Sequence, residues 1–358
     1  MTMSNKDLNA PTIRGSLTFF SVAKLKEKID SFSNPRPAKK VLLPPELSYE
    51  NTEVKFRKFL EKHFFEYLEN FQKVLEANVP KENLKFFYKN ITSLKIGISN
   101  LNLYNFIHSS NFSGFYILRR NKIKIKLTAL KETMYHELLH MATTYVDGLK
   151  VLYCGFSQES FDQISFCDSI NEGYTELLNS RYFLDGKETN GYRFQVTTAK
   201  MLERIIGMEK MQNLFFTANL QGLIDELKVY ASEEDIMKFI ANSDYILKNQ
   251  DWNKTSSVIT DKITKCYHEV NVFILNLFYK KLKMFAQDNL VYMQSALAEY
   301  DFFRQISTQS FQHSYSIKYS DYEIHNEIFS YILTLPNFYD LNPDARLVLE
   351  DNYSLFQR

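Results

Sequence analysis

Residues 130–146 read LKETMYHELLHMATTYV, and the HELLH motif at residues 136–140 directs the structural interpretation. The apolar spacing of the stretch predicts a helix over 130–146. Because residues four apart lie one turn above each other on one face of a helix, His136 and His140 can bind the same metal ion. Glu137 is rotated by about 100° from His136 and can reach a water activated by that metal. The alternative interpretation is the polar face of an ordinary helix.

A small β-region precedes this helix, and helices follow it. Residues 114–127 alternate with period two, which predicts a β-hairpin, whereas residues 53–79 follow the helical period. Short strands are expected within 149–166 and a second helix over 169–183, and most of the chain beyond residue 192 has helical apolar spacing. We therefore predict an α+β protein that is mostly α, with a small β-sheet and an active-site helix packed against a helical C-terminal half.

Two histidines do not complete a catalytic zinc site, which normally has three protein ligands and one open position. The extended motif with a third histidine would need Gly at position 143 and His at position 146, but the chain has Thr143 and Val146. In the stretch SINEGYTELL, residues 169–178, Glu172 and Glu176 stand four apart and share a face of the expected second helix. This face is where a third ligand is expected.

HELLH followed by NEGYTE resembles the gluzincin clan of zinc metallopeptidases. The resemblance implies a zincin active-site helix, Zn²⁺ as the cofactor, and Glu172 as the third ligand beside His136 and His140. It also implies that Glu176, one turn later, fixes the orientation of a ligand histidine. Gly173 is expected to let the second helix approach the histidine-bearing helix closely.

Other interpretations of the second helix stay open. Ser169 and Glu172 have the spacing of a capping box, in which Glu172 would satisfy a backbone N–H group at the start of the helix. Other carboxylates could fill the same coordination role, since Asp and Glu are both zinc ligands. These substitutes are Glu159, Asp162, Asp168 and Glu176.

A second feature resembles the gluzincin aminopeptidases. These enzymes often carry a tyrosine at the start of a later helix that ends in an Ile-Gly step, and here Tyr192 precedes a segment that closes at Ile206-Gly207. The resemblance implies that Tyr192 donates a hydrogen bond to the oxyanion of the reaction, although Tyr192 as a packing residue, Tyr174 and Tyr153 are alternatives. The Gly-x-Met-Glu-Asn motif that binds a free amino terminus is absent before His136, so a typical aminopeptidase is not expected.

Charge and cysteine content exclude several classes of protein. The chain has 358 residues with 43 Lys and Arg against 42 Asp and Glu, so its formal net charge of +1 predicts no general attraction to nucleic acid or membrane. Three cysteines are too few for a disulfide framework, which favours a reducing compartment. The sequence has no apolar leader and no apolar run of membrane-spanning length, and we therefore expect a cytoplasmic location.

The expected organisation has three parts. Prolines between residues 35 and 45 would stop any helix, so residues 1–50 are expected to be an arm or linker. A zincin-like metallopeptidase domain is expected over 51–245 and a helical region over 246–358.

The predicted function is that of a zinc-dependent metallopeptidase, which cleaves a peptide or protein substrate with a metal-activated water and Glu137 as the general base. The alternative is a non-catalytic or regulatory protein that has a structural or relict zinc site and a helical C-terminal half that binds a partner. The presence of Glu137 favours the first, because a purely structural site does not need this carboxylate.

Overall fold

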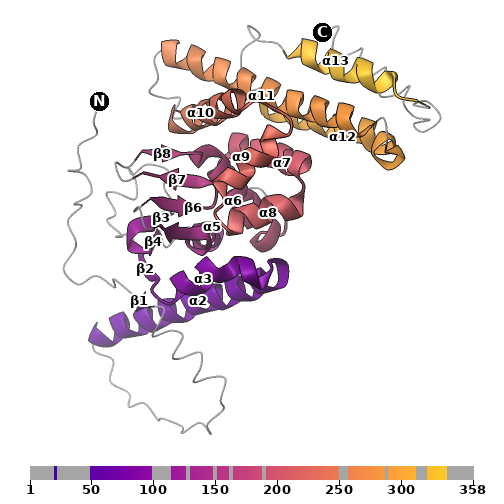
Figure 1. Ribbon diagram of the computed structural model, residues 1–358. Helices are drawn as coiled ribbons and strands as arrows, with labels where there is room; N and C mark the ends of the chain where they lie inside the picture. The colour runs from indigo at the N-terminus through magenta and orange to yellow at the C-terminus, as the bar shows by residue number, and fades with distance from the viewer. Residues whose placement is uncertain are drawn as a thin grey trace. The chain divides into compact units, whose positions relative to one another are not determined.

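The computed structural model describes residues 20–21, 49–98, 114–125, 130–147, 151–160, 164–187, 191–249, 257–286, 289–311 and 321–336. Its described part is mostly helical with small β-sheets (Figure 1), which confirms the expected α+β, mostly α class. The chain forms two compact units, Met1–Tyr145 with Tyr182–Gly186, and Val146–Arg181 with Lys187–Arg358. Most of the expected arm over 1–50 lies outside the described residues, and the expected boundaries at 50 and 245 stay predictions.

In the first unit, a sheet of four short strands has the order β1-β2-β4-β3. Its strands β3 and β4 form the predicted antiparallel hairpin, and β2 runs parallel to β4. Asn121 adopts a left-handed conformation with φ of 44° at the turn, and Ile123 and Ile125 are fully buried, so the alternating pattern gives the sheet one apolar face. The bounds are β1 Phe20–Ser21, β2 Lys95–Ile98, β3 Gly114–Ile117 and β4 Lys122–Ile125.

The helices of this unit build an aromatic core. The expected helix at 53–79 is α2 (Tyr49–Asn78), which is followed by η2 (Lys81–Leu84) and α3 (Lys85–Ile91). Figure 1 shows α2 and α3 side by side. Phe71 of α2 stacks on Phe183 with ring centroids 5.3 Å apart, and Tyr135 stacks on the same ring at 4.3 Å. Such aromatic pairs bury large apolar areas and hold their neighbours in place.

The histidine-bearing helix, α5 (Leu130–Thr143), ends three residues earlier than predicted, and Thr144–Val146 form strand β5. The side chain of Asn90 donates hydrogen bonds to the carbonyl oxygens of Met141 at 2.9 Å and Thr144 at 2.6 Å. The hydroxyl of Thr144 also donates to the carbonyl of His140 at 2.7 Å. These bonds satisfy carbonyl groups that the end of a helix leaves unpaired, and β-branched residues favour the extended backbone that follows.

The second unit begins with the expected short strands, β6 (Leu152–Cys154), β7 (Ser157–Glu159) and β8 (Ser165–Phe166), which pair antiparallel in sequence order. Helices form the rest of its described part, and Figure 1 shows α10 beside α11 and α12 beside α13. None of the described helices is both long enough and apolar enough to cross a membrane. The helices are α6 Asp168–Phe183, α7 Arg193–Ile206, α8 Met208–Phe216, α9 Leu220–Lys228, α10 Glu233–Asn249, α11 Ser257–Phe285, α12 Leu290–Phe311 and α13 Tyr322–Leu333.

Gly173 does allow a close approach, but its neighbour is not the expected one. A Cβ atom at this position of α6 would lie 2.1 Å from the carbonyl oxygen of Gln195 in α7. The close approach therefore brings the first turn of α7 against α6, and the expectation that Gly173 makes room for the histidine-bearing helix is wrong. Further along the same helices, Glu203 of α7 accepts hydrogen bonds from Tyr174 at 2.9 Å and from Arg181.

Gly173→Ala should lower the free energy of unfolding by about 1–3 kcal/mol, because the new methyl group meets a backbone carbonyl that cannot move alone. Gly222→Ala in α9 is a comparison in which the methyl group meets side chains, of Leu214 and Asn219, instead of a backbone carbonyl; because Asn219 caps α9 by accepting the Gly222 N–H at 2.8 Å, its cost includes about 1 kcal/mol from the disturbed cap. Urea unfolding of both variants measures the difference. A Gly173→Ala protein as stable as the wild type would contradict the close packing of α6 on α7.

Candidate metal centre

The two histidines of the HELLH motif lie together on the buried face of α5. His136 is 6% exposed and His140 is 7% exposed, and their Nε2 atoms lie 3.1 Å apart. Their rings are nearly perpendicular, with an interplanar angle of 76°. The helical spacing of four residues thus directs both imidazole nitrogens toward one point, as the sequence predicts.

Glu172, on the first turns of α6, belongs to the same group. The ligand atoms of His136, His140 and Glu172 all lie within 4.8 Å of one another. Among the residues that the structure describes, no other group of three His, Cys, Asp or Glu side chains is placed to hold a metal ion. Glu159 and Asp168, which the sequence offered as alternatives to Glu172, are not members of the group. A further alternative, Asp162, lies outside the described residues.

The donor set is of a kind that binds zinc, and the separation of the two histidine nitrogens suits one shared metal ion. Two imidazole nitrogens bound to a tetrahedral zinc ion at about 2.0–2.1 Å would lie about 3.3 Å apart. The observed separation of 3.1 Å between the Nε2 atoms is close to this value. Two histidines with one glutamate is also a ligand set that catalytic zinc sites use. The three side chains can therefore hold one metal ion.

Two further carboxylates of the predicted site are buried. Glu137 of α5 is 5% exposed, and Glu176 of α6 is 4% exposed. The side-chain amide of Asn179 donates a hydrogen bond of 3.3 Å to Glu176. Burial of a carboxylate costs free energy unless polar partners compensate it. The roles of Glu137 as base and Glu176 as a partner of a ligand histidine stay predictions.

The start of α6 is held by an aspartate that the sequence does not reveal. Asp244 of α10 is buried, and its carboxylate accepts hydrogen bonds from the backbone N–H groups of Cys167 and Ser169, each at 2.8 Å. Cys167 has a left-handed backbone with φ of 65°, an uncommon conformation for a residue with a side chain. Burial raises the pKa of the Cys167 thiol well above its usual value, and the charges of Asp244 and Asp168 add to this effect.

The capping-box interpretation of Glu172 is wrong. The helix begins at Asp168, and the N–H group of Ser169, which Glu172 would satisfy in a capping box, is bonded to Asp244. The hydroxyl of Ser169 is buried and has no hydrogen-bond partner within the described part of the chain. Glu172 is thus not the residue that caps this helix.

Asp168 has a structural role at the same helix start. Its carboxylate accepts hydrogen bonds from the hydroxyls of Ser157, at 2.6 Å, and of Ser165. One turn on, the side-chain oxygen of Asn171 accepts the backbone N–H of Phe156 at 3.0 Å. The first turn of α6 is therefore bonded to the strand region before it as well as to α10.

The tyrosines take different positions. Tyr192 stands directly before α7 in a left-handed conformation with φ of 58°, and α7 ends at Ile206 before Gly207, as expected. Its catalytic role stays a prediction. The alternatives bond elsewhere, since Tyr174 donates to Glu203 at 2.9 Å and Tyr153 donates to Asp147 at 3.4 Å.

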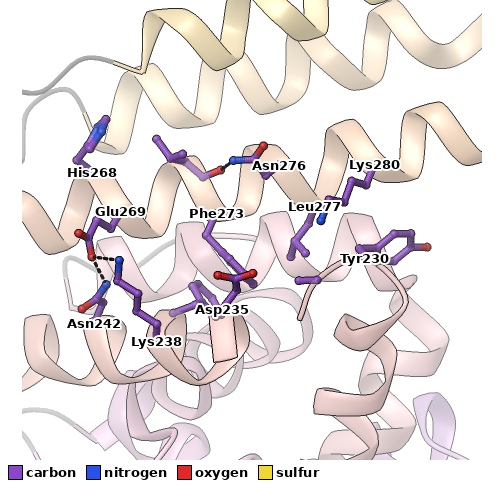
Figure 2. A pocket seen from close by; sticks show the side chains of 13 residues that line it. Tyr230, Asp235, Lys238, Asn242, His268, Glu269, Phe273, Asn276, Leu277 and Lys280 are labelled. Carbon is purple, nitrogen blue, oxygen red and sulfur yellow. Dashed lines mark hydrogen bonds and ion pairs between the residues drawn. The ribbon is translucent and has the colours of Figure 1, made fainter. Parts of the chain in front are cut away.

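A separate pocket of about 310 Å³ lies between α10 and α11 (Figure 2). Lys238 and Lys280 face Asp235 and Glu269 in its wall, so the lining does not select an ion of either sign. Glu269 accepts a hydrogen bond from Asn242 at 2.7 Å and pairs with Lys238 at 3.3 Å, which joins the two helices. None of the predicted site residues lines this pocket.

Comparisons with protein-family models, with curated proteins and with solved structures find no match for this chain. The site itself is therefore the basis for inferring a function. Sequence reasoning found the three residues of the group but missed Asp244, because the N–H groups that it binds lie 77 and 75 residues away in the chain. No local pattern marks such a contact.

The stability of the protein should depend on the ionisation of Asp244. Burial raises its pKa to about 6, and the hydrogen bonds from Ser169 and Cys167 lower it only in part. The folded state therefore holds this proton more tightly than the unfolded chain, in which an aspartate has a pKa of about 3.9. Ionisation of Asp244 thus costs folding free energy as the pH rises from about 4 to about 6.

Asp244→Asn removes this titration. The free energy of unfolding of the wild type, relative to that of Asp244→Asn, should fall by up to about 1.4 kcal/mol per pH unit in that window and stay constant above it. Urea titrations between pH 4 and 8 measure the difference. A difference that does not change with pH would contradict the raised pKa.

Proposed function

We propose that this chain is a zinc-dependent metallopeptidase of the gluzincin type that cleaves a peptide or protein substrate. The observation that carries the proposal is the convergence of His136, His140 and Glu172, whose ligand atoms lie within 4.8 Å of one another. The resemblance of HELLH and NEGYTE to the gluzincin clan supports the same ligand set. His136, His140 and Glu172 would hold one Zn²⁺ ion.

The chemistry divides between the cofactor and the chain. Bound zinc polarises the scissile carbonyl and makes a water acidic enough to attack it near neutral pH. In our proposal a carboxylate oxygen of Glu137 takes the proton of the attacking water and later delivers it to the leaving nitrogen. Glu137 follows His136 directly in α5, and this spacing allows the carboxylate to act beside the ligands without being one of them.

The burial of Glu137 favours a catalytic over a structural site. At 5% exposure its carboxylate carries a desolvation cost that a site for metal storage or folding alone would not require. An alanine or a leucine at this position of α5 would stabilise the helix at least as well. A buried glutamate next to a proposed ligand histidine has the position that a general base would need.

Two other residues have supporting roles in the proposal. Glu176, buried one turn after Glu172, would accept a hydrogen bond from a ligand histidine and fix its orientation. Tyr192 would donate a hydrogen bond to the oxyanion. The close approach of Gln195 to Gly173 supports this role, because it brings the first turn of α7, which Tyr192 precedes, against the part of α6 that holds Glu172.

The wild-type protein should bind one zinc ion per chain. His136→Ala, His140→Ala and Glu172→Ala should each abolish binding, since two protein ligands leave the site incomplete, and Glu176→Ala should weaken it by about 10- to 100-fold. His268→Ala in α11, which removes a histidine outside the group, is the matched control. Titration against a competing chelator measures the affinities, and full zinc retention in the three ligand variants would refute the site.

Glu137→Gln should keep the metal and lose peptide hydrolysis, because an amide cannot accept the proton of the attacking water. Loss of a general base typically lowers the rate by about 10²- to 10⁴-fold. Metal content and cleavage of an unstructured protein such as casein are measured together, with Glu209→Gln at the exposed start of α8 as the control. Equal hydrolysis by Glu137→Gln and the wild type would refute its role, and zinc binding without any hydrolysis in the wild type would favour the regulatory alternative.

A further inference from the structure

We propose that Asp244 is a positioning residue for the metal centre. Its carboxylate accepts the N–H groups at the start of α6 and so leaves the Glu172 side chain available to bind the metal. This inference rests on the proposed function, because it concerns the ligand role of Glu172. Asp244 lies on α10, a helix that supplies none of the proposed ligands.

The geometry of the contact fixes the helix start in two directions. The two oxygens of the Asp244 carboxylate each accept one backbone N–H group, from Ser169 to Oδ1 and from Cys167 to Oδ2, at 2.8 Å in both cases. A carboxylate that accepts two N–H groups defines both the position and the direction of the backbone that donates them. The start of α6, at Cys167 and Ser169, lies five and three residues before Glu172 and is thereby bonded to α10.

Asp244 also removes a competing use of Glu172. Ser169 and Glu172 have the spacing at which a glutamate turns back to accept the N–H group at the start of its own helix. That N–H group is bonded to Asp244 instead. If Asp244 is lost, the Ser169 N–H group loses this acceptor, and Glu172 has the capping-box spacing at which its carboxylate can take the place of Asp244. Capping and metal binding would then compete for one side chain.

Two other side chains of this turn are bonded to the strand region before α6. Asp168 is engaged by the hydroxyls of Ser157 and Ser165, and Asn171 accepts the N–H group of Phe156. Neither of these contacts satisfies the N–H group of Ser169. Because a buried N–H group without a partner is costly, the loss of Asp244 must be answered by another acceptor or by movement of the helix start.

The experiment measures the affinity of the full-length protein for Co²⁺ and Zn²⁺ and the visible absorption of the Co²⁺ form, in the wild type, Asp244→Ala and Asp244→Asn. Asp244→Asn keeps one acceptor oxygen and the shape of the side chain, so it serves if Asp244→Ala does not fold. Asn271→Ala is the control for lost stability. The buried side chain of Asn271 accepts a hydrogen bond from the Ser307 hydroxyl and donates one to the Asp321 carboxylate, in another part of the helical region.

Asp244→Ala should bind Co²⁺ and Zn²⁺ about 10- to 100-fold more weakly than the wild type, the loss typical of residues that orient a metal ligand, and Asp244→Asn, which has one acceptor oxygen for two N–H groups, should show a smaller loss. The Co²⁺ absorption should change in shape, because the glutamate ligand is partly withdrawn, whereas Asn271→Ala should keep the wild-type spectrum and affinity. Wild-type metal affinity in both Asp244 variants, or a loss in Asn271→Ala equal to theirs, would overturn this inference and leave the proposed function standing. A wild-type protein that binds neither metal would overturn the proposed function and this inference with it.

Discussion

The site depends on two imidazole groups that a single helical turn brings together inside the protein. Their Nε2 atoms lie 3.1 Å apart on α5, in which every residue from Met134 to Thr143 is buried. A helix with this much buried surface normally carries only apolar side chains there, so the polar residues of HELLH are an exception to the pattern of their own helix. The chemistry that we propose follows from that exception, because two nitrogens at this distance suit a shared metal ion.

The two helices that carry the proposed ligands are held by different means. Carbonyl groups at the end of α5 accept hydrogen bonds from the side chain of Asn90 and from the hydroxyls of Thr143 and Thr144. The first turn of α6 is satisfied by the carboxylate of Asp244. The ends of a helix leave backbone N–H and C=O groups without a partner in the same helix. In each case here, a side chain from another helix bonds such groups close to a proposed ligand.

Local patterns predicted much of this architecture. Helical periodicity located α2, α5 and α6, alternation located the hairpin of β3 and β4, and the spacing of HELLH and NEGYTE selected all three residues of the metal group. What failed depended on contacts distant in sequence. The early end of α5 reflects Asn90, the partner of Gly173 is α7, and the capping of α6 comes from Asp244. Such contacts are decided by packing, which a local pattern does not contain.

The left-handed Cys167 at the start of α6 has a chemical consequence. Its thiol is fully buried and its pKa is raised, so the native protein presents almost no thiolate there for alkylation or oxidation. Reaction of this cysteine requires a local opening that exposes the thiol to solvent. The rate at which a thiol reagent labels Cys167 therefore reports local opening at the start of α6, close in sequence to Glu172.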